Sequence, residues 1–381
     1  MAPRVAIACV WLLALTARAS VAAPAPAPAA RALPPIRHVF LLLLENQSYE
    51  ISFARASPAA YLAHTLPARG ALLTHYYAIG HASLGNYVAL VSGQAPNEAT
   101  QLDCPTLVDF APTAMQLDAH GQLPGSGCVY PVMVKTLPDQ LEAAGLTWRG
   151  YMEDMGKDPR SEAATCGHVP LGKPDNTLMA RVSDQYAAKH DPFVYFHSII
   201  DDQARCDAHV VNLERLPQDL SAAATTPNYV FITPNLCNDG HDDPCLDGRR
   251  GGLTAINSFL KKWVPLIVDS PAFRADGLLV ITFDESDGSG PEGSRACCGE
   301  RALPGAKYPP GIGGPGGGRV GALALSPFVK PGTVSAVHYN HYSLLRTVEA
   351  IFALPYLGYA AERDLSIFGA DVFTAATGLD R

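Results

Sequence analysis

The stretch IRHVFLLLLENQSYE, residues 36–50, decides the fold of this chain. Within it, the apolar run Val39 to Leu44 stops abruptly at Glu45 and Asn46. A short run with a β-branched start favours a strand buried on both faces, as in a parallel sheet covered by helices. Open α/β sheets bind ligands at the carboxyl ends of their strands, and the oxygens of Glu45 and Asn46 suit a hard divalent cation. Taken alone, the pair is better interpreted as the start of a polar loop.

Further apolar runs alternate with helix-sized segments along the chain. The expected strands are His38 to Leu44, Leu72 to Tyr77, Thr147 to Met152, Phe193 to His197, Asn228 to Thr233, Leu278 to Phe283 and Val320 to Ser326. The expected helices include Tyr87 to Ser92, Thr136 to Ala144, Leu253 to Val268 and Tyr342 to Phe352. This alternation predicts βαβ units and an α/β fold with a mostly parallel sheet. The span 288–318 is rich in Gly and Pro and is predicted to be a long loop near a site.

The composition allows a large core and argues against one class of partner. Of the 381 residues, 48% are hydrophobic and 17% are charged, which is typical of a globular chain. The net charge is -8 and no basic run occurs, so we expect no binding to nucleic acid.

The N-terminal part has the pattern of an export signal. Residues 1–23 combine Arg4, the apolar segment Val5 to Leu15 and a tail of small residues. The apolar segment is too short for a membrane span, although an uncleaved anchor is the alternative, and no later stretch is long enough. Residues 24–35 form a Pro/Ala linker, and residues 36–381 are expected to be one domain. A secreted or periplasmic location follows.

The cysteines are consistent with export. Cys9 would leave with the signal, and eight cysteines remain, an even number that suggests disulfides. Sequence leaves the pairing open; neighbours in order would join Cys104 to Cys128 and Cys237 to Cys245. The adjacent Cys297 and Cys298 would each pair elsewhere or form a vicinal bond. The lack of a C-x2-C pair makes a thiolate zinc site unexpected.

A second informative stretch is HYYAIGHASLGNYVALVSG, residues 75–93. A turn at Gly80 and His81 precedes an expected helix, so Ser83 falls at or near a helix N-terminus. The free N–H groups and the dipole there stabilise an anion. Ser83 is therefore either a simple N-cap or a nucleophile whose alkoxide is favoured by that environment.

Three other stretches carry polar groups at the ends of expected elements. The strand within GLLVITFDESDG, residues 277–288, ends in Asp284 and Glu285. The strand within YVFITPNLCNDGHDD, residues 229–243, is followed by Asn235, Asn238, Asp239 and His241. His341 lies at the start of an amphipathic helix that Asn340 or His341 caps. Carboxylates at two parallel strand ends could share a cation, and a solvated acidic loop is an equal alternative. A lone histidine in a loop, such as His241, more often neither binds metal nor orients a phosphate.

Taken together, these stretches resemble the phosphoesterase family of bacterial acid phosphatases and phospholipases C, within the alkaline-phosphatase-like superfamily. The matching pieces, in family order, are ENQSYE at 45–50, HASLGNYVALVSG at 81–93, PNLCNDGHD at 234–242, TFDESDG at 282–288 and the tail 319–359. The resemblance covers most of residues 37–359 and implies a three-layer α/β sandwich. Ala82 and Gly85 stand where the family often has Pro, which should change the rigidity of the turn.

The resemblance also implies a phosphoryl-transfer site. Ser83 matches the nucleophile, His241 is assigned as proton donor and His341 as phosphate binder. Asn86 is expected to contact phosphate oxygens, with His81 a weaker candidate. One divalent cation, Ca²⁺, Mg²⁺ or Mn²⁺, is expected on Glu45, Asn46, Ser83, Asp284 and Glu285. A second metal would need further ligands, which Asp239 or Asp242 could supply.

The function predicted in this way is a secreted or periplasmic metal-dependent phosphatase. It would hydrolyse phosphate monoesters, including phosphoinositides, through a phosphoserine, with phosphorylated small molecules or phospholipid head groups as substrates. One alternative is a phospholipase-C-like phosphodiesterase, which would use the same catalytic groups. The other is an inactive exported binding protein, for which loss of Ser83 would change nothing.

Overall fold

The computed structural model describes Met1 and residues 33–374. The predicted signal segment and most of the linker lie outside the described residues. Among the described residues, no helix is long and apolar enough to cross a membrane.

The element bounds are as follows. The strands are β1 (His38–Leu44), β2 (Ala71–Leu73), β3 (Tyr76–Tyr77), β4 (Ala111–Pro112), β5 (Gly125–Ser126), β6 (Trp148–Met152), β7 (Val210–Asn212), β8 (Tyr229–Thr233), β9 (Gly277–Phe283), β10 (Ala322–Leu325), β11 (Thr333–Ser335) and β12 (Tyr339–Asn340). The α-helices are α1 (Tyr49–Ser52), α2 (Ser83–Ser92), α3 (Leu137–Ala143), α4 (His197–Ile200), α5 (Gln203–His209), α6 (Leu216–Asp219), α7 (Gly252–Val268), α8 (Pro271–Asp276) and α9 (His341–Ile351). Short π or 3-10 turns are η1 (Tyr61–Thr65), η2 (Thr100–Leu102), η3 (Ala188–His190), η4 (Pro192–Tyr195), η5 (Leu213–Arg215) and η6 (Gly358–Ala361).

The core is an eight-stranded sheet in the order β11-β2-β10-β9-β1-β8-β6-β7. Five of its seven pairings are parallel, and only the two that involve β10 are antiparallel. The strands β1 and β9 at its centre are buried along their whole length, as their continuous apolar runs predict. The mostly parallel α/β sheet is therefore confirmed.

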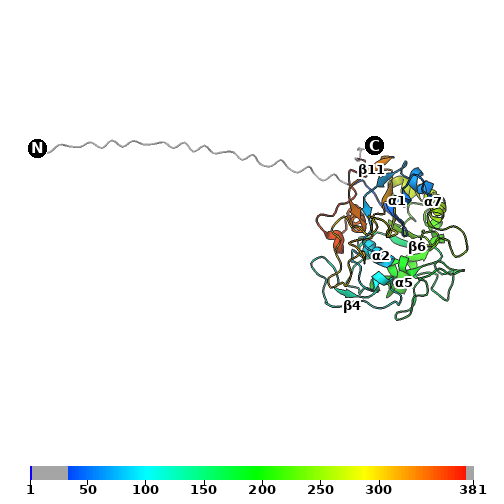
Figure 1. Cartoon of the computed structure of the whole chain (residues 1–381), viewed down its shortest axis with the longest axis horizontal. Helices are drawn as coiled ribbons and strands as arrows, with labels where there is room; N and C mark the ends of the chain where they lie inside the picture. The colour runs from blue at the N-terminus through cyan, green and yellow to red at the C-terminus, as the bar shows by residue number, and fades with distance from the viewer. Residues whose placement is uncertain (2–32, 375–381) are drawn as a thin grey trace. The chain divides into compact units, whose positions relative to one another are not determined.

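Helices cover the sheet, and α2, α5 and α7 can be located by their labels in Figure 1. Among them, α2 packs on α3 and α9, whereas α7 packs on α8. The long helix α7 buries one apolar stripe, with Ile256, Leu260, Val264 and Ile267 almost inaccessible to solvent. The fold is the expected sandwich of a sheet between helices.

Two predicted strands were wrong. The run Phe193 to His197 is a 3-10 turn, η4, followed by the start of α4. Pro192 begins that turn and the side chain of Asp191 accepts a hydrogen bond from the Phe193 N–H at 3.1 Å, so local capping favours a turn. The run Leu72 to Tyr77 is split into β2 and β3, which belong to different sheets.

Four disulfides lie among the described residues. The predicted bonds Cys104–Cys128 and Cys237–Cys245 are both present. A third bond joins Cys166 to Cys206, and the adjacent Cys297 and Cys298 form the vicinal bond. The alternative in which those two pair elsewhere is thus excluded.

Candidate active site

The site begins where three neighbouring parallel strands end. In the register of the sheet, Leu44 of β1 lies opposite Phe283 of β9, which places Glu45 beside Asp284. The Asp284 N–H donates to the Leu44 carbonyl at 2.8 Å, and the Asn46 N–H donates to Asp284 Oδ1 at 3.1 Å. On the other side of β1, the Glu45 N–H donates to the carbonyl of Asp239, which follows β8. The two carboxylates predicted at strand ends are therefore neighbours, and Asp239 joins them.

Ser83 is the first residue of α2. Its hydroxyl reaches the acidic cluster, which is formed by Glu45, Asp239 and Asp284. Ser83 Oγ donates to Glu45 Oε2 at 2.9 Å, and the side chain is almost fully buried. The preceding Ala82 has φ +70°, a left-handed conformation that costs energy for any residue except glycine. This turn aims the serine from the helix start toward β1, as expected for either a cap or a nucleophile.

Asn86 holds that turn in place. Its Oδ1 accepts hydrogen bonds from the N–H groups of Ile79 and Gly80 at 2.9 and 3.0 Å. Its Nδ2 donates to the carbonyls of Gly80 and Ala82 at 2.9 and 3.3 Å. Both ends of the amide are thus engaged with backbone, so the geometry makes Asn86 a brace for the turn before Ser83. The contact with phosphate oxygens that the family resemblance implies for Asn86 stays a prediction.

Glu45 connects the cluster to Ser83, Tyr87 and His190. Its Oε1 accepts a hydrogen bond from the Tyr87 hydroxyl at 2.5 Å, and Tyr87 in turn stacks on His190 with ring centroids 5.1 Å apart. His190 Nε2 lies 3.2 Å from Glu45 Oε2, and its Nδ1 lies 3.4 Å from Asp239 Oδ2. Sequence reasoning missed His190 because it lies in the short turn η3, where no strand end or helix start marks it.

The electrostatics of the cluster favour a bound cation. Burial raises the pKa values of Glu45, Asp239 and Asp284, and for Asp239 and Asp284 the charge of Glu45 raises them further. Burial also lowers the pKa of His190 well below its usual range, so the ring is neutral and able to act as a ligand.

Several buried polar atoms of the cluster have no hydrogen-bond partner among the described residues. They are Asn46 Oδ1, Asp284 Oδ2, Asp239 Oδ2 and both ring nitrogens of His190, whose contacts with Glu45 and Asp239 lack hydrogen-bond geometry. Such unpaired atoms are costly unless a ligand satisfies them. Ligand atoms of Glu45, His190 and Asp239 also lie within 4.8 Å of one another. A donor set of oxygen and imidazole nitrogen therefore fits a divalent metal ion.

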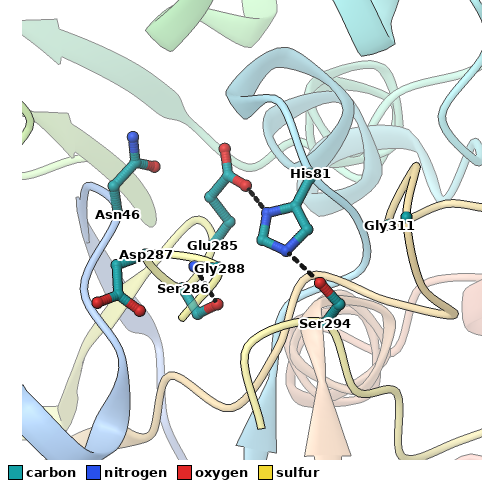
Figure 2. Close-up of a pocket in the computed structure, with 9 residues that line it drawn as sticks. Asn46, His81, Glu285, Ser286, Asp287, Gly288, Ser294 and Gly311 are labelled. Atoms are coloured by element: carbon teal, nitrogen blue, oxygen red, sulfur yellow. Dashed lines mark hydrogen bonds and ion pairs between the residues drawn. The ribbon is translucent and has the colours of Figure 1, made fainter. Parts of the chain in front are cut away.

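His81 and Glu285 form a second, adjoining pair. His81 Nδ1 contacts Glu285 Oε2, while its Nε2 lies 2.8 Å from the Gly293 carbonyl and 3.1 Å from Ser294 Oγ. Figure 2 shows the Glu285 carboxylate and the His81 ring facing each other. Burial raises the pKa of Glu285 to about 8. Burial also opposes protonation of His81, but its hydrogen bond to Glu285 and the negative charge of that carboxylate, with smaller contributions from Gly293 and Asp284, together raise the His81 pKa. His81 thus positions Glu285.

The two other predicted histidines have different surroundings. His241 is about a quarter exposed, its Nδ1 lies 2.8 Å from Asp242 Oδ1, and that hydrogen bond raises its pKa. Its ring centre lies 6.3 Å from that of His190, so it borders the cluster. His341 is fully buried at the start of α9, and burial lowers its pKa to about 4.

Both ring nitrogens of His341 have protein partners. Nε2 lies 2.6 Å from the Asp284 carbonyl, and Nδ1 lies 3.0 Å from the Tyr76 hydroxyl. Since a carbonyl only accepts, Nε2 carries the proton and Nδ1 accepts from Tyr76. The geometry makes His341 a support for the end of β9 and leaves it no free nitrogen for a phosphate.

A buried ion pair lies at the same helix start. Lys189 Nζ donates to Asp103 Oδ2 at 3.1 Å, and Asp103 Oδ1 accepts from the Leu84 N–H of α2 at 3.0 Å. Burial opposes the charge of Lys189, but Asp103 and Glu45 raise its pKa and keep it protonated. No sequence pattern marks Lys189, which precedes His190 in the chain. Its positive charge offsets part of the negative charge of the cluster.

Comparison with solved structures defines the class of fold. The structure matches a protein in the alkaline phosphatase superfamily from Vibrio parahaemolyticus with a TM-score of 0.50 and 11% sequence identity, covering 85% of this chain and 68% of that chain. This likeness concerns the fold. The chain belongs to the Phosphoesterase family, whose model matches residues 52–355.

Two relatives illustrate the range of the similarity. A phosphate-repressible acid phosphatase from Penicillium chrysogenum is 27% identical over 77% of this chain and 54% of its own length. A phosphatidylinositol-3-phosphatase from Mycobacterium tuberculosis is 27% identical over 89% of this chain and 84% of its own length. The chain spans between half and three fifths of the length of the fungal acid phosphatases that it matches.

Proposed function

We propose that this protein is a phosphoric ester hydrolase that cleaves phosphate monoesters through a phosphoserine on Ser83. The observation that carries the proposal is the hydrogen bond from Ser83 Oγ to Glu45, at a helix N-terminus and beside two buried carboxylates, Asp239 and Asp284, that each have one oxygen without a hydrogen-bond partner. The names of the acid phosphatase and phosphatidylinositol-3-phosphatase relatives support it. The second relative makes a phosphorylated inositol head group a substrate to test.

We further propose that Glu45, Asn46, Ser83, Asp284 and Glu285 hold one divalent cation, with His190 and Asp239 adjoining it. The bound cation would supply the positive charge that stabilises a serine alkoxide and neutralises phosphate oxygens. Ca²⁺, Mg²⁺ and Mn²⁺ fit the oxygen-rich set best, although the imidazole of His190 leaves room for a softer ion.

In the proposed reaction, Ser83 Oγ attacks phosphorus as its proton leaves toward the Glu45 carboxylate. The ester P–O bond breaks, and His241 donates a proton to the departing alcohol. Water then attacks the phosphoserine, His241 takes a proton from it, and phosphate leaves as Ser83 regains its own. The N–H groups at the start of α2 favour the negative charge that develops beside Ser83.

We also propose export, because the four disulfides among the described residues suit an oxidising compartment. The N-terminal sequence pattern points the same way.

Hydrolysis of p-nitrophenyl phosphate tests the activity. Ser83→Ala should abolish turnover, and a chelator should do so reversibly, with activity returning on addition of one divalent metal. Ser92→Ala is the matched control, because Ser92 is buried in the same helix but only bonds local backbone and the Gln94 N–H. Turnover that survives Ser83→Ala would overturn the nucleophile assignment, and turnover of a diester but not this monoester would favour the phosphodiesterase alternative.

The phosphoserine itself has a direct test. Enzyme quenched in acid during turnover should carry one added phosphate on the peptide that contains Ser83, detected by mass spectrometry. The Ser92→Ala variant should carry the same label, and Ser83→Ala should carry none. Label found on a histidine instead would contradict the proposed intermediate.

A further inference from the structure

A pocket of about 520 Å³ opens beside the acidic cluster. Asn46 and Glu285, both proposed metal ligands, form its inner wall, and Figure 2 shows Asp287 on the side of Asn46 and Ser294 on the side of His81. Gly311 and Gly313 of the Gly-rich loop complete the lining. The loop 288–318, which the sequence predicted to lie near a site, therefore contributes four of the nine lining residues. The group attached to a bound phosphate would lie in this pocket.

The lining is polar and small. Among its nine residues there is no Lys, no Arg and no large apolar side chain. Three of the nine are glycines, and a Cβ added at Gly313 would meet nothing within 4 Å, so the pocket has free space on that side. The Ser294 hydroxyl and the exposed backbone at Gly288 and Gly313 offer hydrogen bonds without a net positive charge, whereas the buried Ser286 hydroxyl already donates to the Gly293 carbonyl.

The one charge in the lining without an opposite partner is Asp287. His81 and Glu285 compensate each other. Within the part of the chain that the structure describes, the Asp287 carboxylate accepts hydrogen bonds only from neutral groups, the Ser48 and Ser289 hydroxyls and the Ser289 N–H. An anionic leaving group in this pocket would meet the like charge of Asp287, and the lining holds no lysine or arginine to offset it. A neutral polyol would find hydrogen-bond partners.

We propose that this pocket is the leaving-group subsite of the proposed phosphatase, and that it takes a small uncharged group rich in hydroxyls while Asp287 disfavours an anionic one. The proposal rests on the hydrolase activity proposed above. It names the substrate class as monophosphates of neutral polyols, in preference to substrates that carry a carboxylate or second phosphate near the ester.

The test compares two substrates that differ in one charge. Glycerol 3-phosphate and 3-phosphoglycerate have the same carbon skeleton, but the second ends in a carboxylate. We expect kcat/KM to be about threefold higher for glycerol 3-phosphate, because Asp287 repels the carboxylate of 3-phosphoglycerate. The difference is small because two charges separated by water interact weakly. Asp287→Asn should remove most of that preference. Asp287→Lys changes the charge by two units, so it should reverse the preference to about threefold in favour of 3-phosphoglycerate.

Two controls isolate the local charge. Asp269→Asn also removes an exposed acid, but Asp269 lies after α7 and pairs with Arg274, so the substrate ratio should stay as in the wild type. High salt should weaken the preference of the wild type, since exposed charges are screened. If both Asp287 variants still hydrolyse p-nitrophenyl phosphate but keep the wild-type ratio of kcat/KM for the two substrates, the subsite proposal is wrong. If the wild type hydrolyses none of these phosphate esters, the hydrolase proposal itself is wrong.

Discussion

Replacement of Asn86 by alanine separates a bracing role from a phosphate-binding role. In the structure the side chain makes four hydrogen bonds to the backbone of residues 79–82, and it is completely buried. The alanine leaves the buried N–H groups of Ile79 and Gly80 without acceptors. An orphaned buried donor costs about 1–3 kcal/mol, so we expect the free energy of unfolding to fall by roughly 3 kcal/mol.

That loss translates into a measurable melting temperature. The described segment 33–374 has 374 − 33 + 1 = 342 residues. At about 2.1 cal/mol/K per residue the unfolding entropy is about 0.7 kcal/mol/K, so roughly 3 kcal/mol lowers Tm by about 4 °C. Because the strained turn at Ala82 is released, kcat should also fall by more than tenfold, whereas the inhibition constant of inorganic phosphate should change little.

Thermal unfolding and phosphate inhibition of purified protein decide between the two roles. Asn176→Ala is the control, since Asn176 is exposed and should leave Tm within about 1 °C of the wild type. An Asn86→Ala protein with unchanged Tm and much weaker phosphate inhibition would refute the bracing role. It would restore the contact with phosphate that the family resemblance implied.

The remaining predictions concern the cluster and its supports. Burial raises the folded-state pKa of Glu285 to about 8. Protonated Glu285 therefore contributes fully to stability below pH 4.5, and this contribution is lost as pH rises toward 8. Chelated protein should show a Tm that falls from pH 5 to 8, and added divalent cation should raise Tm most at pH 8. A flat profile in calorimetry would contradict this. His341→Phe should lower kcat and destabilise the fold by about 1–3 kcal/mol, since the Tyr76 hydroxyl and the Asp284 carbonyl lose their partner, while a role in binding phosphate predicts a change in KM alone. Replacing Cys166 and Cys206 by serine opens a loop with a sequence separation of 40 and should lower the free energy of unfolding by about 4 kcal/mol. Reduction of the bond between the adjacent Cys297 and Cys298 should lower it far less, because that bond closes almost no loop. Equal losses in denaturant titrations would refute the loop-entropy reasoning.

Local sequence was sufficient for the sheet and for one half of the site. Continuous apolar runs indicate strands buried on both faces, so β1 and β9 could be predicted from the sequence. Because these strands are parallel neighbours, the residues directly after them meet at the carboxyl edge of the sheet. Glu45, Asn46, Asp284 and Glu285 follow from that rule. The start of α2 near Ser83 follows from the turn before it.

Tertiary structure alone decided the rest. His190 enters the cluster from a short turn whose position depends on packing against Tyr87, and no periodic pattern encodes such a contact. A short run such as 193–197, four apolar residues followed by a histidine, fits a strand or a buried turn equally well until capping is considered. The sequence thus determined which residue types stand at the strand ends, because the pattern of burial is local. It could not determine where the side chains of Asn86 and His341 point, because that depends on backbone groups brought close only by folding.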